Sequence, residues 1–408
     1  MRILHLADLH LGKIVHEVSM TEDQAHVLDQ VADLVSQGGV DVVAITGDVY
    51  DRAIPPVAAT QLMDDFLARL VLGLGVRVLL TPGNHDSAER LAFGGRLMRE
   101  RGLFIAPGLS GLTGTSGGGA LLPVVLEDAH GPVSFHPLPF VAPVMLKETE
   151  TDLGLGDFDE AMGRVMARLT LDPAGRNVCL AHCFTLGGQS CESERPLSIG
   201  GADMVSPERF SPFHLTLLGH LHRPQKVAAN VFYAGSPLKY SFSEVGHTKT
   251  AALYDLSADG SFTREEMAFS PRHDLRALSG SLEELLAAAG ADQNREDYLS
   301  LELTDRGPLF DYAAKLRQAY PNVLTISRVA YREAGEGGIE IRGKTEWEIV
   351  RAFFDHVSQG GLNEPEEAVM RAVVEEMLRG EHMAEAALPP ADSEDTAAAG
   401  VLAAGVRK

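Results

Sequence analysis

Five short apolar runs in the first 225 residues each end in polar side chains, and this pattern constrains the fold more than any other feature. Each run has the length of a buried β-strand and stops in a glycine-containing or turn-like stretch. A strand that only fills a core has no use for carboxylates and imidazoles at its tip. The residues concerned are Asp8 and His10, Asp48, then Asn84, His85 and Asp86, then His182, and finally His220 and His222.

Helical patterns separate the first three runs. In residues 21–39, the pair Thr21 and Gln24 matches a capping box, and an apolar stripe follows until two glycines end it. Residues 56–72 predict a second helix, and residues near 87–101 predict a third. Strands that alternate with helices indicate a layered α/β domain, in which the strand ends meet at one edge of a sheet.

The strand and helix pattern continues to about residue 272 and then changes. Up to that point we expect strands between 120 and 140 and at 176–184, 231–237 and 250–256, and a helix at 157–170. Beyond it, strands at 298–304 and 322–330 enclose a helix near 308–319, which predicts a small β-α-β cap. The expected parts are therefore an α/β domain at 1–272, a cap domain at 273–344, a helix pair at 345–382 and a disordered tail at 383–408.

The predicted helix pair carries an apolar stripe on each helix. The first stripe consists of Trp347, Val350, Phe354 and Val357, and the second of Val369, Val373 and Met377. Asn363 and Pro365 mark the start of the second helix. Such a pair either packs on a core of its own or offers its stripe to a partner. The short length of chain around it favours partner binding.

The composition is that of a soluble globular protein, with 45% hydrophobic and 23% charged residues in 408. No run of about 18 apolar residues predicts a membrane span, and the N-terminus has no signal-peptide pattern. Three cysteines, Cys179, Cys183 and Cys191, suit the cytoplasm, and we interpret them as small buried thiols in preference to a zinc site with His182. The net charge of −22 argues against a protein that binds nucleic acid unaided.

The polar strand ends form a set of ligand types suited to metal ions. Two aspartates, one asparagine and four histidines offer oxygen and nitrogen donors without a thiolate, which suits first-row divalent cations. Seven ligands exceed the needs of one tetrahedral ion and match two ions that share a carboxylate and a water. Two such ions are the usual arrangement for displacement at phosphorus. A single histidine after a strand is more often an ordinary turn residue. The interpretation therefore depends on the occurrence of polar residues at five strand ends.

These motifs, DLH, GD, GNHD, the strand-end His182 and GHLH, resemble the calcineurin-like metallophosphoesterase superfamily over about residues 1–250. The resemblance implies a first metal ion on Asp8, His10, Asp48 and His222. It implies a second ion on Asp48, Asn84, His182 and His220, so that Asp48 bridges the two. His85 would face the phosphate as the catalytic residue that protonates the leaving oxygen, and Asp86 would orient the loop or His85.

Within that superfamily, the stretches LHLADLHLGK, GDVYDRAIPP and TPGNHDS resemble the SbcD family of bacterial nuclease subunits. Leu11 after His10, and Thr81-Pro82 before the glycine, depart from the protein serine/threonine phosphatases. The resemblance implies two Mn²⁺ ions, with Mg²⁺ as a weaker substitute, and a cap domain that contacts DNA. It implies a homodimer formed through helices near 56–72 and 88–101, and binding of an SbcC-type ABC ATPase through the C-terminal helices.

The activity implied is exonuclease action on double-stranded DNA ends and endonuclease action on single strands, in double-strand-break and hairpin processing. Archaeal and eukaryotic relatives have a phosphate-contacting histidine where this chain has Asp51, which would repel a phosphate. Two alternatives stay open: a phosphodiesterase for a small molecule or cyclic nucleotide, and a non-catalytic scaffold. Lys13, Arg52 and Arg90 are either DNA contacts or ordinary surface charges.

Overall fold

The structure, a computed structural model, describes residues 1–109, 122–147, 156–194, 203–329, 345–357 and 362–374. The chain divides into two compact units. The first comprises Met1–Ser279, Glu283–Leu301 and Asp311–Ile326, and the second comprises Gly280–Leu282, Glu302–Phe310 and Ser327–Lys408. Among the described residues, no helix is both long enough and apolar enough to cross a bilayer.

Two six-stranded sheets form the centre of the first unit. The first sheet has the order β16-β15-β1-β4-β5-β6, and its central strands are parallel. Its strands are β1 (Arg2–Leu6), β4 (Val42–Thr46), β5 (Arg77–Thr81), β6 (Leu103–Ile105), β15 (Thr250–Leu256) and β16 (Phe262–Ala268). Strand β15 pairs antiparallel with β1, and β16 pairs antiparallel with β15, which explains why a strand from residue 250 lies beside the N-terminus.

The second sheet has the order β13-β14-β12-β9-β8-β7, and β9 and β12 are parallel neighbours in it. Its strands are β7 (Val124–Asp128), β8 (Gly131–Pro137), β9 (Arg176–His182), β12 (Leu215–Gly219), β13 (Gln225–Ala228) and β14 (Val231–Tyr233). Every residue of β4, β9 and β12 is buried. Continuous apolar runs are expected for strands covered on both faces.

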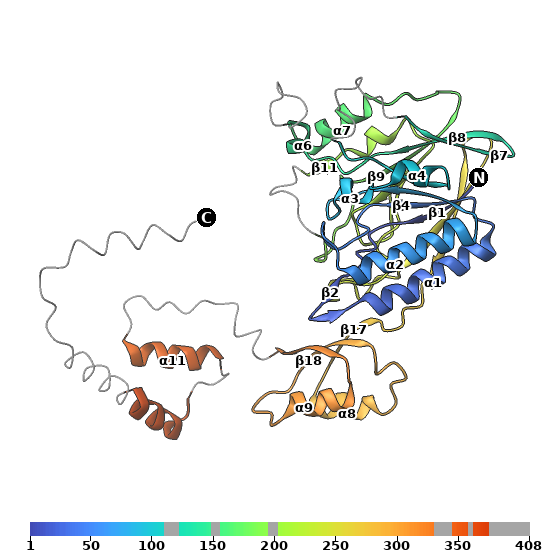
Figure 1. The fold of residues 1–408 in the computed structure, drawn as a ribbon. Coiled ribbons are helices and arrows are strands. Elements are labelled where there is room, and N and C mark those ends of the chain that lie inside the picture. Colours follow the sequence, from blue (N-terminus) through green and yellow to red (C-terminus); the bar gives the residue numbers. More distant parts are fainter. Residues whose placement is uncertain (110–121, 148–155, 195–202, 330–344, 358–361, 375–408) are drawn as a thin grey trace, which may run out of the picture. The chain divides into compact units, whose positions relative to one another are not determined.

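The sheets pack face to face and carry helices on their outer faces. Ile3, Ala44 and Leu180 belong to the apolar layer between the sheets. Helices α1 (Thr21–Gly38) and α2 (Val57–Ala68) cover the first sheet, side by side, as Figure 1 shows. Helix α7 (Phe158–Met166) packs against the second sheet. The predicted layered α/β sandwich is therefore confirmed.

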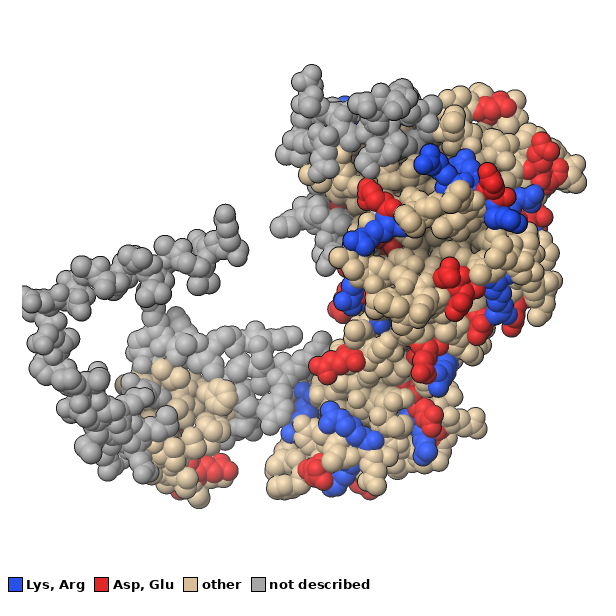
Figure 2. All heavy atoms as spheres, viewed as in Figure 1, with Lys and Arg blue, Asp and Glu red and all other residues tan. Residues whose placement is uncertain are grey.

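Short elements connect these layers. They are β2 (Ile14–Val15), β3 (Val18–Ser19), the π-turn η1 (Arg69–Gly73), α6 (Pro143–Lys147), β10 (Phe184–Thr185), β11 (Met204–Val205), η2 (Pro207–Phe210) and η3 (Phe242–Glu244). On the face that Figure 2 shows, the Lys and Arg side chains alternate with the Asp and Glu side chains over the α/β domain. That view therefore gives no basic face for unaided DNA binding.

Two sequence-based predictions about the helices are wrong. No capping box forms at Thr21, because Met20 is the N-cap residue and makes no side-chain cap. Gln24 instead turns its side chain toward the loop after β1, where it donates to the His10 carbonyl oxygen at 2.7 Å. The single helix expected near 87–101 consists of two short ones, α3 (Ala88–Leu91) and α4 (Gly95–Arg99), because Gly94 between them adopts a φ of +73°.

The cap contains more than the predicted β-α-β unit. A three-stranded sheet of order β17-β18-β19 combines with two helices. The elements are β17 (Leu275–Gly280), α8 (Leu282–Ala289), β18 (Tyr298–Leu303), α9 (Tyr312–Ala319) and β19 (Val323–Arg328). Sequence reasoning missed β17 and α8, since β17 alternates half-buried and exposed residues and shows no apolar run.

A helix pair lies in the second unit. Helix α11 (Glu346–Val357) is followed by a helix over 364–374, and the reciprocal hydrogen bonds between Asn363 and Glu366 cap the second helix as expected. Arg371 stacks 4.5 Å from the centre of the Trp347 ring, which joins the two helices. Met377 and the predicted disordered tail lie outside the described residues.

Candidate metal centre

All seven predicted ligands and His85 meet where the strands of both sheets end. Asp8 and His10 follow β1, Asp48 follows β4, and Asn84 and His85 follow β5. On the second sheet, His182 is the last residue of β9, and His220 and His222 follow β12. Since β1, β4 and β5 are parallel in one sheet and β9 and β12 in the other, their carboxyl ends converge between the layers.

The first group of side chains surrounds the paired histidines His10 and His222. Their Nε2 atoms lie 3.1 Å apart, and His10 Nε2 lies 3.7 Å from an Asp48 oxygen. Ligand atoms of Asp8, His10 and His222 all lie within 4.8 Å of one another. This group, which we name the first-ion half, therefore consists of the residues predicted to hold the first ion.

The second group centres on Asn84. Its side-chain oxygen lies 2.9 Å from His182 Nε2 and 3.0 Å from His220 Nδ1. His182 Nε2 also lies 3.4 Å from an Asp48 oxygen. We name Asn84, His182 and His220 the second-ion half. Asp48 contacts both halves, which is the position that a bridging ligand requires.

Close backbone approaches build the second-ion half, and strained loops carry ligands of both halves. A Cβ on Gly83 would lie 2.1 Å from Asp48 Oδ1, and one on Gly47 would lie 2.1 Å from His182 Nδ1. The backbone also takes a positive φ, which favours glycine, at Asp8, His10, Asp48 and His220. Non-glycine residues in this conformation concentrate at functional sites. The strand-end glycines therefore allow side chains from different sheets to come together.

His85 and Asp86 sit on the loop after β5. The His85 amide donates to Asp48 Oδ1 at 2.9 Å, and its ring Nδ1 lies 2.8 Å from the Asp51 carbonyl oxygen. A carbonyl can only accept, so Nδ1 carries the proton and Nε2 is left with its lone pair. The Asp86 carboxylate accepts from the amides of Val49, Tyr50 and Gly83. Asp86 thus ties the loop after β4 to the loop after β5.

Asp51 has an opposite charge beside it. Lys13 Nζ lies 2.8 Å from its carboxylate, and His10 Nδ1 lies 3.6 Å away. Burial opposes ionisation of Asp51, but His10 and Lys13 outweigh it and hold the pKa well below its ordinary range. The repulsion of phosphate expected from Asp51 is therefore weakened by Lys13, and Lys13 itself is an ion-pair partner at the edge of the site.

The electrostatics of the buried site fit the binding of cations. Burial raises the pKa of Asp8 well above its usual value. For Asp48, burial also opposes ionisation, but His182 and the other histidines outweigh it and keep the pKa low. Burial lowers the pKa of His10 to about 4 and that of His220 to about 3, so both rings are neutral donors at pH 7. Burial lowers the pKa of His182, but Asp48 outweighs it and raises that pKa to about 9. Asp8 and His182 therefore hold protons in the metal-free site, and a divalent ion would displace them on binding.

Among the residues around the first-ion half that sequence reasoning missed are Gln24, Tyr240, Glu244 and Lys249. Glu244 is completely buried and pairs with Lys249, which donates to the His222 carbonyl oxygen at 2.8 Å. No strand-end motif contains them, since Gln24 lies in a helix and the others follow β14. The one signal in the sequence was the presence of two opposite charges, Glu244 and Lys249, in a short polar stretch before a strand.

The cysteines have no part in either group of predicted ligands. Cys179 and Cys183 are buried in the apolar core of the second sheet, which confirms their interpretation as buried thiols. Cys191 is only half-buried. Its sulfur lies near His222 Nδ1 and a Glu244 oxygen, on the side of His222 away from Nε2.

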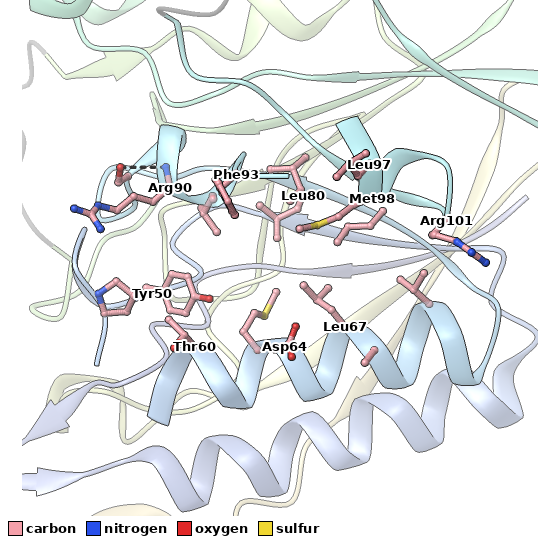
Figure 3. Close-up of a pocket in the computed structure, with 18 of the residues that line it drawn as sticks. Tyr50, Thr60, Asp64, Leu67, Leu80, Arg90, Phe93, Leu97, Met98 and Arg101 are labelled. Carbon is pink, nitrogen blue, oxygen red and sulfur yellow. Dashed lines mark hydrogen bonds between the residues drawn. The ribbon is translucent and has the colours of Figure 1, made fainter. Parts of the chain in front are cut away.

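An apolar pocket of about 680 Å³ lies apart from these ligands, between α2 and the short helices α3 and α4 (Figure 3). Met63 and Leu67 line it from α2, and Phe93, Leu97 and Met98 line it from the other side. Phe93 is 83% exposed and Leu97 79% exposed, which is unusual for neighbouring large apolar side chains.

Two family models match this chain. The family model for the calcineurin-like phosphoesterase matches residues 1–224, and a model described as the type 5 capsule protein repressor C-terminal domain, SbcD_C, matches residues 271–358. Together they have the architecture of an SbcD-type nuclease. A crystal structure of a dimetal phosphatase from Danio rerio is 12% identical with a TM-score of 0.39, covering 66% of this chain and 96% of its own. The structure of TT1561 from Thermus thermophilus is 13% identical with a TM-score of 0.34, covering 65% and 98%.

Proposed function

Because the chain belongs to the calcineurin-like phosphoesterase family, and is thus a phosphoester hydrolase, we propose that it is a Mn²⁺-dependent DNA nuclease of the SbcD type. It would act on double-stranded ends and on single strands in the cytoplasm, in double-strand-break and hairpin processing. One observation supports the proposal: five strand ends from two sheets bring together the seven residues predicted as ligands, with the Asp48 carboxylate close to both groups. The C-terminal match at 271–358 supports the SbcD type over a smaller phosphoesterase.

Two divalent ions would bind in the two halves of the site. Asp8, His10, Asp48 and His222 would hold the first, and Asp48, Asn84, His182 and His220 the second. When bound, such ions supply positive charge to the phosphate and acidify a water molecule. The protein contributes fixed positions: His182 Nδ1 donates to the Thr46 carbonyl oxygen at 3.0 Å, which leaves Nε2 free as a ligand atom.

His85 would act on the leaving oxygen. Its Nδ1–H is engaged by the Asp51 carbonyl oxygen, so Nε2 is the atom that can take up and deliver a proton. Asp86 would maintain the loop that carries His85, through its three backbone hydrogen bonds. His85 is therefore proposed as a catalytic residue, and Asp86 as a positioning residue.

The exposed apolar pocket in Figure 3 would be the homodimer contact. It lies between the two regions predicted for dimerisation, 56–72 and 88–101, and Phe93 and Leu97 project from it largely exposed. A second copy would bury both side chains. The substitution Leu97→Asp should shift the protein from dimer to monomer in light scattering, whereas an unchanged mass would contradict this contact.

The helix pair would bind an SbcC-type ABC ATPase. Val369 and Val373 of the second predicted stripe are 63% and 43% exposed, and Trp347, Val350 and Phe354 of the first are half-buried. Neither stripe is therefore fully buried in the described part of the second unit. That partner would also supply much of the DNA-binding surface that the acidic chain lacks. The cap domain proposed at residues 273–344 would supply further DNA contacts.

Hydrolysis assays with three substrates test the proposal. The purified protein, alone and with its coiled-coil ATPase partner, is given single-stranded DNA, a blunt duplex and a cyclic nucleotide with Mn²⁺ or Mg²⁺. We expect cleavage of DNA that is stronger with Mn²⁺. Preference for the cyclic nucleotide would favour the small-substrate phosphodiesterase, and Mn²⁺ affinity too weak to measure would favour the scaffold. Asp128→Asn, which changes an ion pair at the other end of β9, is the control.

A further inference from the structure

Residues 235–249, which we name the support loop, lie between the two segments that the family models match. We propose that the support loop positions both histidines of the first-ion half, with Glu244 and Lys249 as its central pair. The inference deepens the proposed function and rests on it, because it concerns the same site. It assigns to this loop a role that the strand-end motifs do not include.

The support loop holds the main chain of His222. Lys249 Nζ donates to the His222 carbonyl oxygen at 2.8 Å and to Ser236 Oγ at 2.8 Å, and the Ser236 amide donates to the same carbonyl at 3.1 Å. Gly235 has a φ of +75°, and a Cβ there would lie 2.7 Å from that oxygen. The carbonyl is thus fixed by two donors and a close backbone approach.

The same loop faces the ring of His222. Glu244 Oε1 lies 3.7 Å from His222 Nδ1 and accepts from the Tyr240 amide at 3.1 Å, while its other oxygen pairs with Lys249. Ser193 Oγ lies 2.8 Å from the same nitrogen. Ser193 at hydrogen-bond distance and the Glu244 carboxylate at ion-pair distance favour a proton on Nδ1, which leaves the Nε2 lone pair facing His10. Partners of this kind orient metal-binding histidines and raise their basicity.

The support loop also reaches the loop that carries His10. The Tyr240 hydroxyl donates to the Leu9 carbonyl oxygen and accepts from Gln24 Nε2 at 3.1 Å. Gln24 Nε2 also lies 2.7 Å from the His10 carbonyl oxygen. The Tyr240 ring packs edge-on against His10 at 5.6 Å and His222 at 6.0 Å. One short segment therefore contacts both histidines, which are 212 residues apart.

Burial of the central pair argues against a purely structural role. Glu244 is 0% and Lys249 7% exposed. The free-energy cost of desolvating two charges cancels much of the stabilisation that their attraction provides. An apolar pair of similar size would fill the space at no greater cost. What an apolar pair cannot supply is an acceptor at Nδ1 and a donor at the His222 carbonyl.

A double variant separates positioning from stability. In Glu244→Gln/Lys249→Met no buried charge is left unpaired, so the protein should fold with near-wild-type resistance to urea. We expect affinity for the first Mn²⁺ to fall about 10- to 100-fold and affinity for the second to change less than about 3-fold. Stepwise Mn²⁺ titration of the metal-free protein, followed by calorimetry and electron paramagnetic resonance, measures both.

Two further variants keep the test decisive. Tyr240→Phe removes one hydroxyl while keeping the ring, and should weaken the first ion about 3- to 10-fold even if the double variant does not fold. Asp128→Asn breaks another partly buried ion pair, with Arg176, and should reduce stability without changing either affinity.

The results separate the inference from the proposed function. Wild-type affinity for both ions in the double variant, or in Tyr240→Phe, overturns the positioning role. An equal loss of Mn²⁺ affinity in Asp128→Asn also overturns the positioning role, because the loss would then be explained by reduced stability of the protein. If the wild-type protein binds no Mn²⁺, the proposed function fails and the inference fails with it. If the wild-type protein binds two ions and the variants lose affinity for the first ion alone, the proposed function and the positioning role are both supported.

Discussion

The two halves of the candidate site are built in different ways. In the second-ion half, backbone positions the ligands: Thr46 accepts from His182, and glycines 47 and 83 allow contacts that any side chain would block. In the first-ion half, side chains from a distant segment surround His222 and the His10 loop. Where the backbone positions a ligand, only a substitution that adds a clashing atom moves it. Where side chains position a ligand, removal of a single hydrogen-bonding group can move it. Mutations should therefore affect the halves differently.

The largest effect is expected from Asp48→Ala, since Asp48 is the contact that the two halves share. Removal of its carboxylate takes a ligand from both ions. We expect loss of both Mn²⁺ ions at micromolar concentrations and a fall in DNA hydrolysis of at least about 10⁴-fold. Metal analysis after gel filtration and a single-turnover assay measure the two effects. Retention of both ions would mean that Asp48 is not a bridge.

His85→Ala should separate chemistry from metal binding. The His85 ring contacts the Asp51 carbonyl oxygen, and its amide, which the substitution keeps, donates to Asp48. We expect both ions to remain bound with near-wild-type affinity, and hydrolysis to fall about 10²- to 10⁴-fold. Calorimetric titration with Mn²⁺ and the hydrolysis rate on single-stranded DNA are the measurements. An active variant would refute the role in leaving-group protonation.

The backbone-built half is the part of the site that the sequence predicts best. Asn84 and His182 were predicted because they stand at strand ends, next to glycines such as Gly83, and parallel strands place such ends together. Short sequence patterns at the strand ends were therefore sufficient to predict these ligands. The layered α/β architecture was predicted for the same reason, since buried parallel strands read as continuous apolar runs. The prediction placed the strand ends at the edge of one sheet, whereas the structure divides them between two sheets.

The side-chain-built half could not be predicted completely, because its supports are far apart in the sequence. Gln24 was assigned to a capping box, but its amide reaches the loop after β1 once the helix packs on the sheet. Glu244 and Lys249 look like ordinary surface charges until β14 and β15 place them beneath His222. Periodicity reports which face of an element is apolar, and carries no signal for a single polar contact between distant loops.

Gly83→Ala tests the steric basis of the second-ion half. The new Cβ would lie 2.1 Å from Asp48 Oδ1 and 2.4 Å from the Asp48 amide nitrogen, so the loop must move. Because Asp48 is shared, we expect affinity for both ions to fall, about 10- to 100-fold for the second, and hydrolysis to fall with it. Gly73→Ala is the matched control, because a Cβ there meets nothing within 4 Å. Equal metal affinities in the two variants would contradict the steric argument.

The smallest effect is expected from Asp51→Asn, at the outer edge of the first-ion half. Asp51 is 18% exposed on its side chain and pairs with Lys13, so its carboxylate should contribute about 0.5–1.5 kcal/mol to the unfolding free energy of the metal-free protein. Because His10 and Lys13 overcome burial and lower its pKa below the ordinary 3.8, this contribution is present above about pH 4 and is lost on further acidification. Urea unfolding of both proteins at pH 6 and pH 3 should show a gap that narrows at the lower pH. A gap that stays constant would mean that the Asp51 charge adds nothing to the stability of the metal-free protein.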